Sequence, residues 1–376
     1  MGKTSAWGAM ILIFFWGTCA VRGQDGAPEI PRANPVSLLA ALRNQGALDF
    51  CGEAVPVNQT DPRDIRERLE KEMLLMLWDR PQVILWMKRA RRFFPVIEQQ
   101  LAARGLPTDL KYVAVVESAL RPHVRSAKGA TGYWQFLKST GQKYGLRIDR
   151  QIDERRNIHA STRAAADYLT FLYKQFGSWS LAAAAYNMGE EGLKTAMLTQ
   201  EVTSYYQLYL PLETQRYLFR IIAAKQILSD PRRYGFDLTA QDGYPPVAAE
   251  EIKVTLKERL PLRLIAQSAG IHFKRVKDLN PEIRGVTLVP GQYVLRLPPE
   301  GVPGFHQRLK INRAAWKATR GEQIYVVREG DNLSAIADRF DVPLPALLLW
   351  NRLRPDRPIH PGDRLTIYPP KPKKGG

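Results

Sequence analysis

One carboxylate, Glu117, is placed on a predicted helix in a way that favours acid chemistry. From Leu110 onward, apolar residues recur at spacings of three and four, and Glu117 falls on the same stripe. Burial against apolar neighbours disfavours the charged form of a carboxyl and raises its pKa, so that it can act as a general acid near neutral pH. The alternative is a structural carboxylate that Arg121 or Arg125 neutralises.

Two further strings supply polar and aromatic groups that suit a sugar ligand. Residues 129–136 begin with a glycine-rich stretch whose backbone can approach a ligand closely. Within it, Gln135 is the expected site residue, whereas Trp134 is expected in the core. Residues 181–187 form a helix of small side chains that ends in Tyr186 and Asn187, which are placed to reach into a cleft.

The helices that carry these groups have recognisable starts. Thr108 or Asp109 is expected to cap the helix that bears Glu117. Ser178 or Ser180 is expected to cap the helix that ends at Asn187. Both elements are therefore predicted to be helices with fixed N-termini.

These strings resemble the motifs of bacterial lytic transglycosylases of the SLT type. The motifs occur in the order seen in that family: Glu117-Ser118-Ala119 with Ser126 nine residues after the acid, residues 129–136, Asp153-Glu154-Arg155-Arg156, Ser161-Thr162, Ala185-Tyr186-Asn187 and residues 209–217. The resemblance is dense over about residues 95 to 235. It implies a mainly α, lysozyme-like catalytic domain over residues 106–240.

The resemblance also implies a set of site residues. Glu117 becomes the sole catalytic acid and base, and the expected glycan-binding residues are Ser118, Ser126, Gln135, Tyr186, Asn187, Glu213 and Tyr217. Three places depart from the family pattern, namely Tyr133, the pair Leu137-Lys138, and Met188. They are expected to alter a subsite while leaving the acid in place.

The implied reaction cleaves the β-1,4 bond between N-acetylmuramic acid and N-acetylglucosamine and closes a 1,6-anhydro ring. Ordinary glycosidases use two carboxyl groups, whereas Glu117 would act alone, as acid and then as base. Residues 153–156 are expected to form an ion-pair network rather than to supply a second acid. The alternatives are a goose-type lysozyme-like hydrolase, in which Glu117 directs water, and a peptidoglycan-binding scaffold that no longer cuts.

The C-terminal part indicates a glycan-binding module. Residues 324–369 read as strand, two short helices and strand, and they resemble a LysM module. The resemblance implies glycan binding at Gly330, Asp331, Asn332, Leu333 and Ile359. Residues 247–299 are a weaker copy, a degenerate LysM-like module that either binds weakly or only packs on the catalytic domain. Residues 300–323 are expected to be a linker, and residues 370–376 a basic tail.

The N-terminus indicates export. Residues 1–23 combine Lys3, an apolar run and small residues, which is typical of a secretory signal peptide. The expected location is the periplasm or cell envelope of a Gram-negative-type bacterium, and a lipid anchor at Cys19 is the less favoured alternative. Residues 24–105 are predicted to be an amphipathic helical extension that wraps the catalytic domain.

Composition narrows the partners. The chain has 376 residues, 45% of them hydrophobic, and a net charge of +18, which favours anionic envelope material. Peptidoglycan strands are the expected partner, with peripheral membrane association as a secondary expectation through a basic patch at residues 88–92. Nucleic acid is not expected, because the charge is dispersed and no DNA-binding motif occurs. The five histidines are far apart, so neither a metal nor a cofactor is expected, and the chain is predicted to be a monomer.

Overall fold

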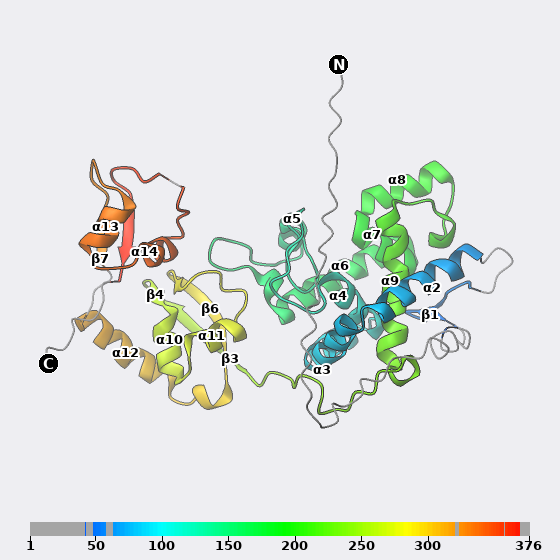
Figure 1. Ribbon diagram of the computed structural model, residues 1–376, viewed down its shortest axis with the longest axis horizontal. Coiled ribbons are helices and arrows are strands. Elements are labelled where there is room, and N and C mark those ends of the chain that lie inside the picture. Colours follow the sequence, from blue (N-terminus) through cyan, green and yellow to red (C-terminus); the bar gives the residue numbers. More distant parts are fainter. Residues whose placement is uncertain (1–41, 43–47, 58–62, 320–322, 357, 369–376) are drawn as a thin grey trace, which may run out of the picture.

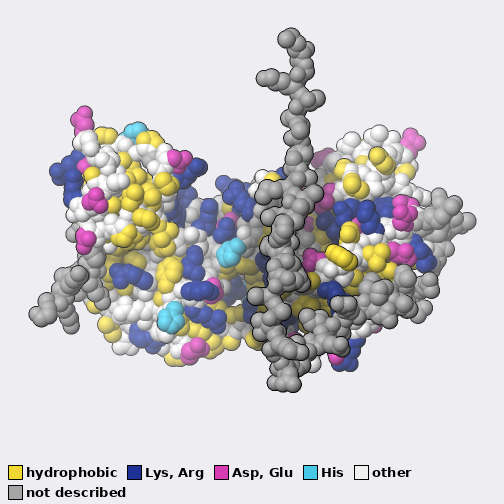
Figure 2. All heavy atoms as spheres, in the orientation of Figure 1, with side chains coloured by type: hydrophobic (Ala, Val, Ile, Leu, Met, Phe, Trp, Pro, Cys, Tyr) yellow, Lys and Arg dark blue, Asp and Glu magenta, His cyan; other side chains and the backbone are white. Residues whose placement is uncertain are grey.

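The computed structural model describes residues 42, 48–57, 63–319, 323–356 and 358–368. The predicted signal peptide, Cys19 and the basic tail lie outside these ranges. In the part that is described, no helix is both long and apolar enough to cross a membrane. Figure 1 shows a larger helical half and two small modules that follow it along the chain. Lys and Arg side chains are spread over both parts on the face seen in Figure 2.

The helical half, residues 48–236, confirms the prediction of a mainly α fold. A short hairpin comes first, with strands β1 (Asp49–Phe50) and β2 (Glu53–Ala54). The helices are α2 (Arg63–Trp78), α3 (Arg80–Ala102), α4 (Lys111–Ser118), α5 (Lys138–Lys143), α6 (Ile158–Phe176), α7 (Trp179–Met188), α8 (Glu190–Gln200) and α9 (Leu212–Ser229). Short 3-10 turns connect several of them.

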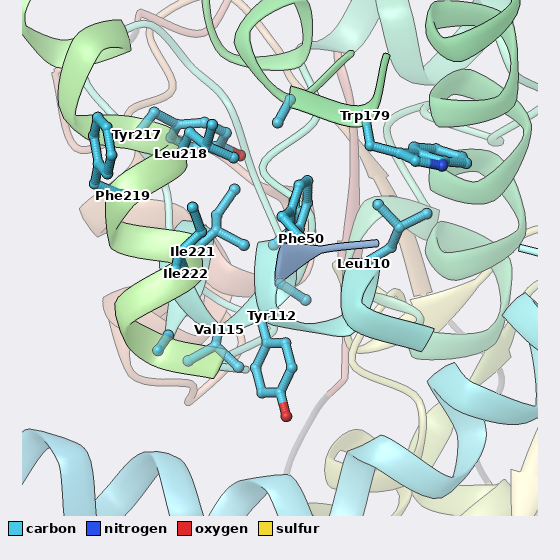
Figure 3. Packing of buried hydrophobic residues seen from close by; sticks show 14 of the residues in the cluster. Phe50, Leu110, Tyr112, Val115, Trp179, Tyr217, Leu218, Phe219, Ile221 and Ile222 are labelled. Atoms are coloured by element: carbon cyan, nitrogen blue, oxygen red, sulfur yellow. The ribbon is translucent and has the colours of Figure 1, made fainter. Parts of the chain in front are cut away.

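The core of this half lies where α4, α7 and α9 meet. Val115 of α4 and Leu218 and Ile222 of α9 are fully buried in one apolar cluster, which Figure 3 shows from close by. Phe50 of the hairpin and Trp179 at the start of α7 belong to the same cluster. Burial of each such side chain stabilises the fold by ~1.5–3 kcal/mol, so this cluster fixes the relative positions of the three helices.

The N-terminal helices are part of the same core. Leu69 and Met73 of α2 and Ile97 of α3 are buried in it, and α2 packs along α9 while α3 packs on α4 and α6. An ion pair strengthens the contact, because the buried Glu72 of α2 accepts hydrogen bonds from the partly exposed Arg216 of α9 at 2.5 and 3.1 Å. The described part of the predicted extension is therefore inseparable from the helical half.

Two βααβ modules follow, as the sequence predicts. In the first module, residues 250–297, β3 (Glu250–Leu256) pairs antiparallel with β6 (Gly291–Leu297), around α10 (Leu262–Ala269) and α11 (Phe273–Leu279). A short pair, β4 (Leu260–Pro261) and β5 (Thr287–Leu288), completes it. In the second module, residues 323–367, β7 (Gln323–Val326) pairs with β8 (Arg364–Ile367), around α13 (Leu333–Arg339) and α14 (Leu344–Asn351).

An asparagine closes each module in the same way. Asn280 donates from Nδ2 to the carbonyl oxygens of Arg296 and of a residue one turn earlier, and its Oδ1 accepts from the Arg296 amide. Asn351 makes the same three hydrogen bonds, with Thr366 in the place of Arg296. Residues 296 and 366 are therefore equivalent positions in the two frames.

The segment predicted to be a linker is largely a helix, α12 (Phe305–Thr319), which corrects that expectation. It packs on α10, and Phe305, Leu309 and Trp316 are buried in the core of the first module. The apolar spacing of four and seven residues that places them on one face is the signal that the linker interpretation overlooked.

The first module is joined to the helical half by its backbone. Ile152 forms an antiparallel bridge with Ile283, and its side chain is buried in the core of the first module. The Asp153 amide donates to the Glu282 carbonyl and the Arg284 amide to the Gln151 carbonyl, both at 2.8 Å. Of the two expectations for this module, packing on the catalytic domain is the one that the structure supports.

Candidate active site

Glu117 lies in the last turn of α4 and is partly exposed. The hydroxyl of Tyr217, a buried residue of α9, donates to Glu117 Oε1 at 2.5 Å. Burial raises the pKa of Glu117 to about 7, although the Tyr217 hydrogen bond and the charge of Arg220 oppose the shift. Because Tyr217 donates to Oε1, the acidic proton is carried on Oε2. Near neutral pH the group is thus poised between acid and base.

The chain turns sharply directly after the acid. Ala119 and Leu120 have φ values of 52° and 57°, in the left-handed region that side chains with a Cβ seldom adopt. Ser118 is buried, and its hydroxyl lies 2.8 Å from the carbonyl oxygen of Tyr133 and 3.2 Å from that of Ala114. The structure therefore places Ser118, which the sequence predicts on the glycan, where it ties α4 to the glycine-rich loop.

The glycine-rich loop, residues 129–136, is held in place by the ion pair of Arg155 and Asp153. A Cβ on Gly132 would lie 1.8 Å from the carbonyl oxygen of Arg155, so only glycine fits there. Arg155 donates to the carbonyls of Gly129 and Phe136 and is paired with the buried Asp153 at 2.8 Å. The ion-pair network predicted for residues 153–156 is present in part: Asp153 pairs with Arg155 and Arg156, whereas Glu154 accepts from the Arg147 amide.

Within that loop, Gln135 and Ser126 have partners on the backbone. Gln135 has a left-handed φ of 47°, and its Nε2 donates to the carbonyls of Val124 and Gly132 at 3.1 and 2.9 Å. Ser126 is exposed, and its Oγ accepts from the Ala130 amide at 3.1 Å. The amide oxygen of Gln135 and the hydroxyl proton of Ser126 are the groups that a ligand can use.

Tyr186 and Asn187 come from the last turn of α7. The Tyr186 hydroxyl donates to the carbonyl oxygen of Trp134 at 2.7 Å, so its lone pairs remain as acceptors. Asn187 Oδ1 accepts from the hydroxyl of the buried Thr214 at 2.8 Å, which orients its Nδ2 as the donor. Trp134 is fully buried, as the sequence predicts.

Arg220 is a charged neighbour of the acid that sequence reasoning missed. It forms an ion pair with Glu213, which is 60% exposed, and its positive charge lowers the pKa of Glu117. Glu213, Tyr217 and Arg220 are spaced by four and three residues, so they share one face of α9. That spacing is the signal that could have found Arg220.

Helix α7 is capped from a distant part of the chain. The Glu53 carboxylate accepts from the Trp179 and Ser180 amides and from the Ser178 hydroxyl. Negative charge at a helix N-terminus is stabilising, which helps to fix Tyr186. Ser178 is the N-cap, as predicted.

The predicted cap of α4 is wrong, because neither Thr108 nor Asp109 caps this helix. Asp109 instead accepts hydrogen bonds from the Cys51 amide at 3.0 Å and from Lys225 at 2.6 Å. These bonds tie the β1–β2 hairpin to the start of the helix that carries the acid and to α9.

The loop of the second module that was predicted to bind glycan is internally braced. Asp331 accepts from the Tyr325 hydroxyl at 2.5 Å and from the Arg328 amide at 2.8 Å. Asn332 caps α13 by accepting from the Ala335 amide at 2.8 Å. Gly330 has a φ of 81°, while Leu333 and Ile359 pack partly on the module core. In the described part of the chain, no three His, Cys, Asp or Glu side chains are grouped to hold a metal ion.

Two family models match this chain. Residues 94–207 match the transglycosylase SLT domain, and residues 325–367 match the LysM domain. The SLT match covers less than half of this chain. The matched segment contains Glu117, the glycine-rich loop, Tyr186 and Asn187, whereas Glu213 and Tyr217 lie beyond its end. The second module is the LysM domain.

Named relatives agree with the SLT assignment. The chain is 34% identical over 293 residues to the membrane-bound lytic murein transglycosylase D of Escherichia coli, in strains K12 and O6:H1 alike. The aligned region covers 74% of this chain and 64% of each relative, so the chain spans less than two thirds of their length.

Solved structures give a weaker likeness. The 70 kDa soluble lytic transglycosylase of Escherichia coli is 18% identical, with a TM-score of 0.32 over 41% of this chain and 26% of that chain. The lytic transglycosylase Slt of Pseudomonas aeruginosa is 20% identical, with a TM-score of 0.29 over 40% of this chain and 26% of that chain. The assignment therefore stands on the sequence matches.

Proposed function

We propose that this protein is a peptidoglycan lytic transglycosylase that uses Glu117 as its only acid and base. The observation that carries the proposal is the half-buried Glu117 inside an SLT domain, with its pKa raised to about 7 and Tyr217 bonded to Oε1. The relatives named lytic murein transglycosylase D support the same substrate.

In the first step, Glu117 Oε2 gives its proton to the oxygen that links N-acetylmuramic acid to N-acetylglucosamine. The bond from that oxygen to C1 of the muramic sugar breaks, and positive charge develops on the sugar ring. Tyr217 keeps its hydrogen bond to Oε1 and stabilises the carboxylate that forms. A general acid contributes ~10²–10⁴-fold in rate, so correct positioning of the strand supplies much of the rest.

In the second step, the Glu117 carboxylate takes the proton from the C6 hydroxyl of the same muramic sugar, and the C6 oxygen bonds to C1. The 1,6-anhydro ring closes, Glu117 is protonated again, and no water is consumed. The balance requires only one carboxyl group. The other carboxylate near Glu117 is Glu213, which is 60% exposed and paired with Arg220.

The remaining groups are proposed to hold the strand. Asn187, which Thr214 orients, donates from Nδ2 to an acetamido carbonyl. Tyr186 accepts from a sugar hydroxyl, and Gln135 Oε1 and the Ser126 hydroxyl are proposed to contact the same strand. Ser118 acts by positioning α4 on the glycine-rich loop. These groups orient the sugar so that its C6 hydroxyl, instead of water, faces the carboxylate.

The second module is proposed to keep the enzyme on its substrate. Its LysM match supports glycan binding at the loop of Gly330 to Leu333 and near Ile359. The mature protein is proposed to act as a monomer in the periplasm or cell envelope, after residues 1–23 direct its export. The membrane-bound name of the relatives favours peripheral membrane association.

The decisive experiment digests purified sacculi with the wild type and with Glu117→Gln, followed by mass spectrometry of the fragments. Anhydro-muropeptides from the wild type alone support the proposal. Fragments with free reducing ends support a hydrolase, and no fragments from the folded wild type support a scaffold. Circular dichroism of Glu117→Gln controls for folding, because glutamine can still accept the Tyr217 hydrogen bond.

The pH profile tests the role of Tyr217. Because the acid must be protonated, activity should fall as the pH rises above about 7, the pKa of Glu117. In Tyr217→Phe the hydrogen bond that lowers this pKa is lost, so the alkaline limb should shift to higher pH while the rate falls. An unshifted limb in a folded variant would remove Tyr217 from the proposed mechanism.

A further inference from the structure

A cavity of about 590 Å³ lies between the helical half and the first module. Its walls come from α3, from the turn after Glu117, from the start of α6, from residues 244–249, and from α11 and β6 of the first module. The volume is within the ~300–1,000 Å³ of small-ligand pockets. Glu117 does not line this cavity, so it is a feature separate from the acid itself.

The cavity is lined by an excess of positive charge. Its cations are Arg89, Arg92, Arg121, Lys274, Arg275 and Arg296. The acid among the lining residues is Asp278, which is paired with Lys274 at 2.6 Å. Within the described residues, no carboxylate lies within 4.0 Å of any of the five arginines. Unbalanced charge of this kind attracts anions.

Three of these arginines are held in place by backbone carbonyls. Arg89 donates to the carbonyl of Ala119 at 3.2 Å and Arg121 to that of Ser118 at 3.2 Å. Arg92 donates to the carbonyl of Pro245 at 3.1 Å. Two of the three are therefore fixed to the turn that directly follows Glu117, which makes the cavity a neighbour of the proposed reaction site.

Arg296 is the buried member of the set. It is 9% exposed, and its Nε has no hydrogen-bond partner. Glu282 is a neighbour whose pKa the charge of Arg296 lowers, but no hydrogen bond joins the two side chains, and Glu282 Oε1 accepts from Asn157 at 3.0 Å. A buried guanidinium Nε without a hydrogen-bond partner is costly. An anion in the cavity would relieve this cost by accepting from Arg296.

The βααβ frame does not require an arginine there. Residue 366 occupies the equivalent position in the second module, closed by the same asparagine bonds, and it is a threonine. Arg296 is thus a local addition, placed where the first module faces the helical half.

The other wall of the cavity is apolar. Phe93, Leu120 and Tyr133 line it from the helical half, and Ile158 and Leu279 complete it. A ligand that suits this lining carries anionic groups together with short apolar groups. If the substrate is peptidoglycan, its sugars are neutral and its stem peptide has both features.

We propose that this cavity binds the carboxylates of the stem peptide on the glycan strand that is being cut. This proposal rests on the proposed function, because it assumes that the substrate is peptidoglycan. Arg296 and Arg275 take the carboxylates and the apolar wall takes an alanyl methyl group, while Arg89 and Arg121 join the cavity to the turn after Glu117. The first module thereby selects strands that still carry peptides.

The direct test is calorimetric binding of the free tetrapeptide L-alanyl-γ-D-glutamyl-meso-diaminopimelyl-D-alanine to the full chain at low salt. We expect binding that Arg296→Gln weakens about tenfold or more, because charge-assisted hydrogen bonds are lost. Arg296→Lys should restore part of it, because the charge returns without the planar fork. Arg232→Gln, at an exposed arginine 79% accessible, is the matched control and should bind as the wild type does.

Several results would overturn the proposal. They are no binding of the tetrapeptide, equal binding by a folded Arg296→Gln, and equal binding of a tetrapeptide whose carboxylates are amidated. Binding of phosphatidylglycerol vesicles that depends on Arg296, without binding of the tetrapeptide, would assign the cavity to lipid headgroups instead. A thermal melt of each variant separates loss of binding from loss of folding.

A second measurement separates this idea from the proposed function. The rate of product formation is compared on intact sacculi and on strands whose peptides an amidase has removed. Arg296→Gln should lower the ratio of these rates, and Arg232→Gln should not. If the wild type binds the tetrapeptide but cleaves neither substrate, the proposed function is refuted and the cavity remains a peptide-binding site. If the wild type cleaves and Arg296→Gln leaves the ratio of the two rates unchanged, the proposed function stands and the peptide site is refuted.

Discussion

The two βααβ modules have the same frame and different surroundings. Each places two short helices against an antiparallel strand pair, and each is closed by an asparagine that bonds the last strand. The first module takes Ile152 of the helical half into its own core and pairs with it through the backbone. The second module has a core of its own and meets the other parts through contacts such as the hydrogen bond from Arg352 to Gln151 at 2.6 Å. A repeated frame can thus either share its core with the helical half or keep a core of its own.

Truncation should give the largest difference between the two modules, measured as a change in melting temperature. Removal of residues 320–376 should leave the melting temperature of the remainder almost unchanged, because the second module has its own core. Removal of residues 247–376 should lower it by roughly 10 °C or more, because Ile152 and the backbone of residues 151–153 lose their partners. Differential scanning calorimetry of the two truncated chains measures the difference. Equal melting temperatures would contradict the view that the first module is integral.

The closing asparagines should differ in importance by their burial. Asn280 is fully buried, so Asn280→Ala should cost ~3–5 kcal/mol, since it leaves the Arg296 amide and carbonyl without partners. Asn351 is partly exposed, so water can replace its bonds and Asn351→Ala should cost ~1–2 kcal/mol. Urea unfolding monitored by fluorescence reports both. The larger loss in Asn351→Ala would reverse the comparison.

A smaller effect is expected at the contact between the helical half and the first module. Ile152→Ala should cost ~2–3 kcal/mol, because it leaves a cavity in the core of the first module. Hydrogen exchange should then increase in both β6 and residues 151–153, and not in the second module. Exchange confined to the helical half would show that the two parts open independently.

The smallest expected effect is a pH dependence at the same contact. Burial raises the pKa of Glu282, so the folded state holds its proton more tightly than the unfolded chain. The contact should therefore be most stable below the ordinary pKa of a glutamic acid and lose stability as the pH rises through the raised value. Glu282→Gln should flatten this slope in melts between pH 4 and 8. If the slope of stability against pH is unchanged in Glu282→Gln, groups other than Glu282 cause the pH dependence.

Local patterns predicted much of this molecule. The apolar stripe placed Glu117 among apolar neighbours, and Ser178, one of the two predicted caps, is the N-cap of α7. The βααβ order of both modules also follows from short-range spacing. Such features depend on residues within one or two turns of each other, which is what a periodic pattern records.

Long-range partners were not predictable in the same way. Glu53 caps α7 from 125 residues away, and Ile152 enters the core of another module. No periodicity in the sequence connects such residues, because the contact arises only when the elements pack. The glycan-binding roles of Ser118 and Gln135 were inferred from a motif, which cannot say that their polar atoms contact the backbone.

The capping of α7 by Glu53 limits how far the chain can be shortened without loss of the contacts around Glu117. The SLT match covers residues 94–207, yet the carboxylate that anchors α7 precedes it and the hydroxyl bonded to Glu117 follows it. An excised fragment cut at the match boundaries would lack both. A fragment that keeps both contacts must therefore include Glu53 of the hairpin and extend beyond Tyr217 of α9.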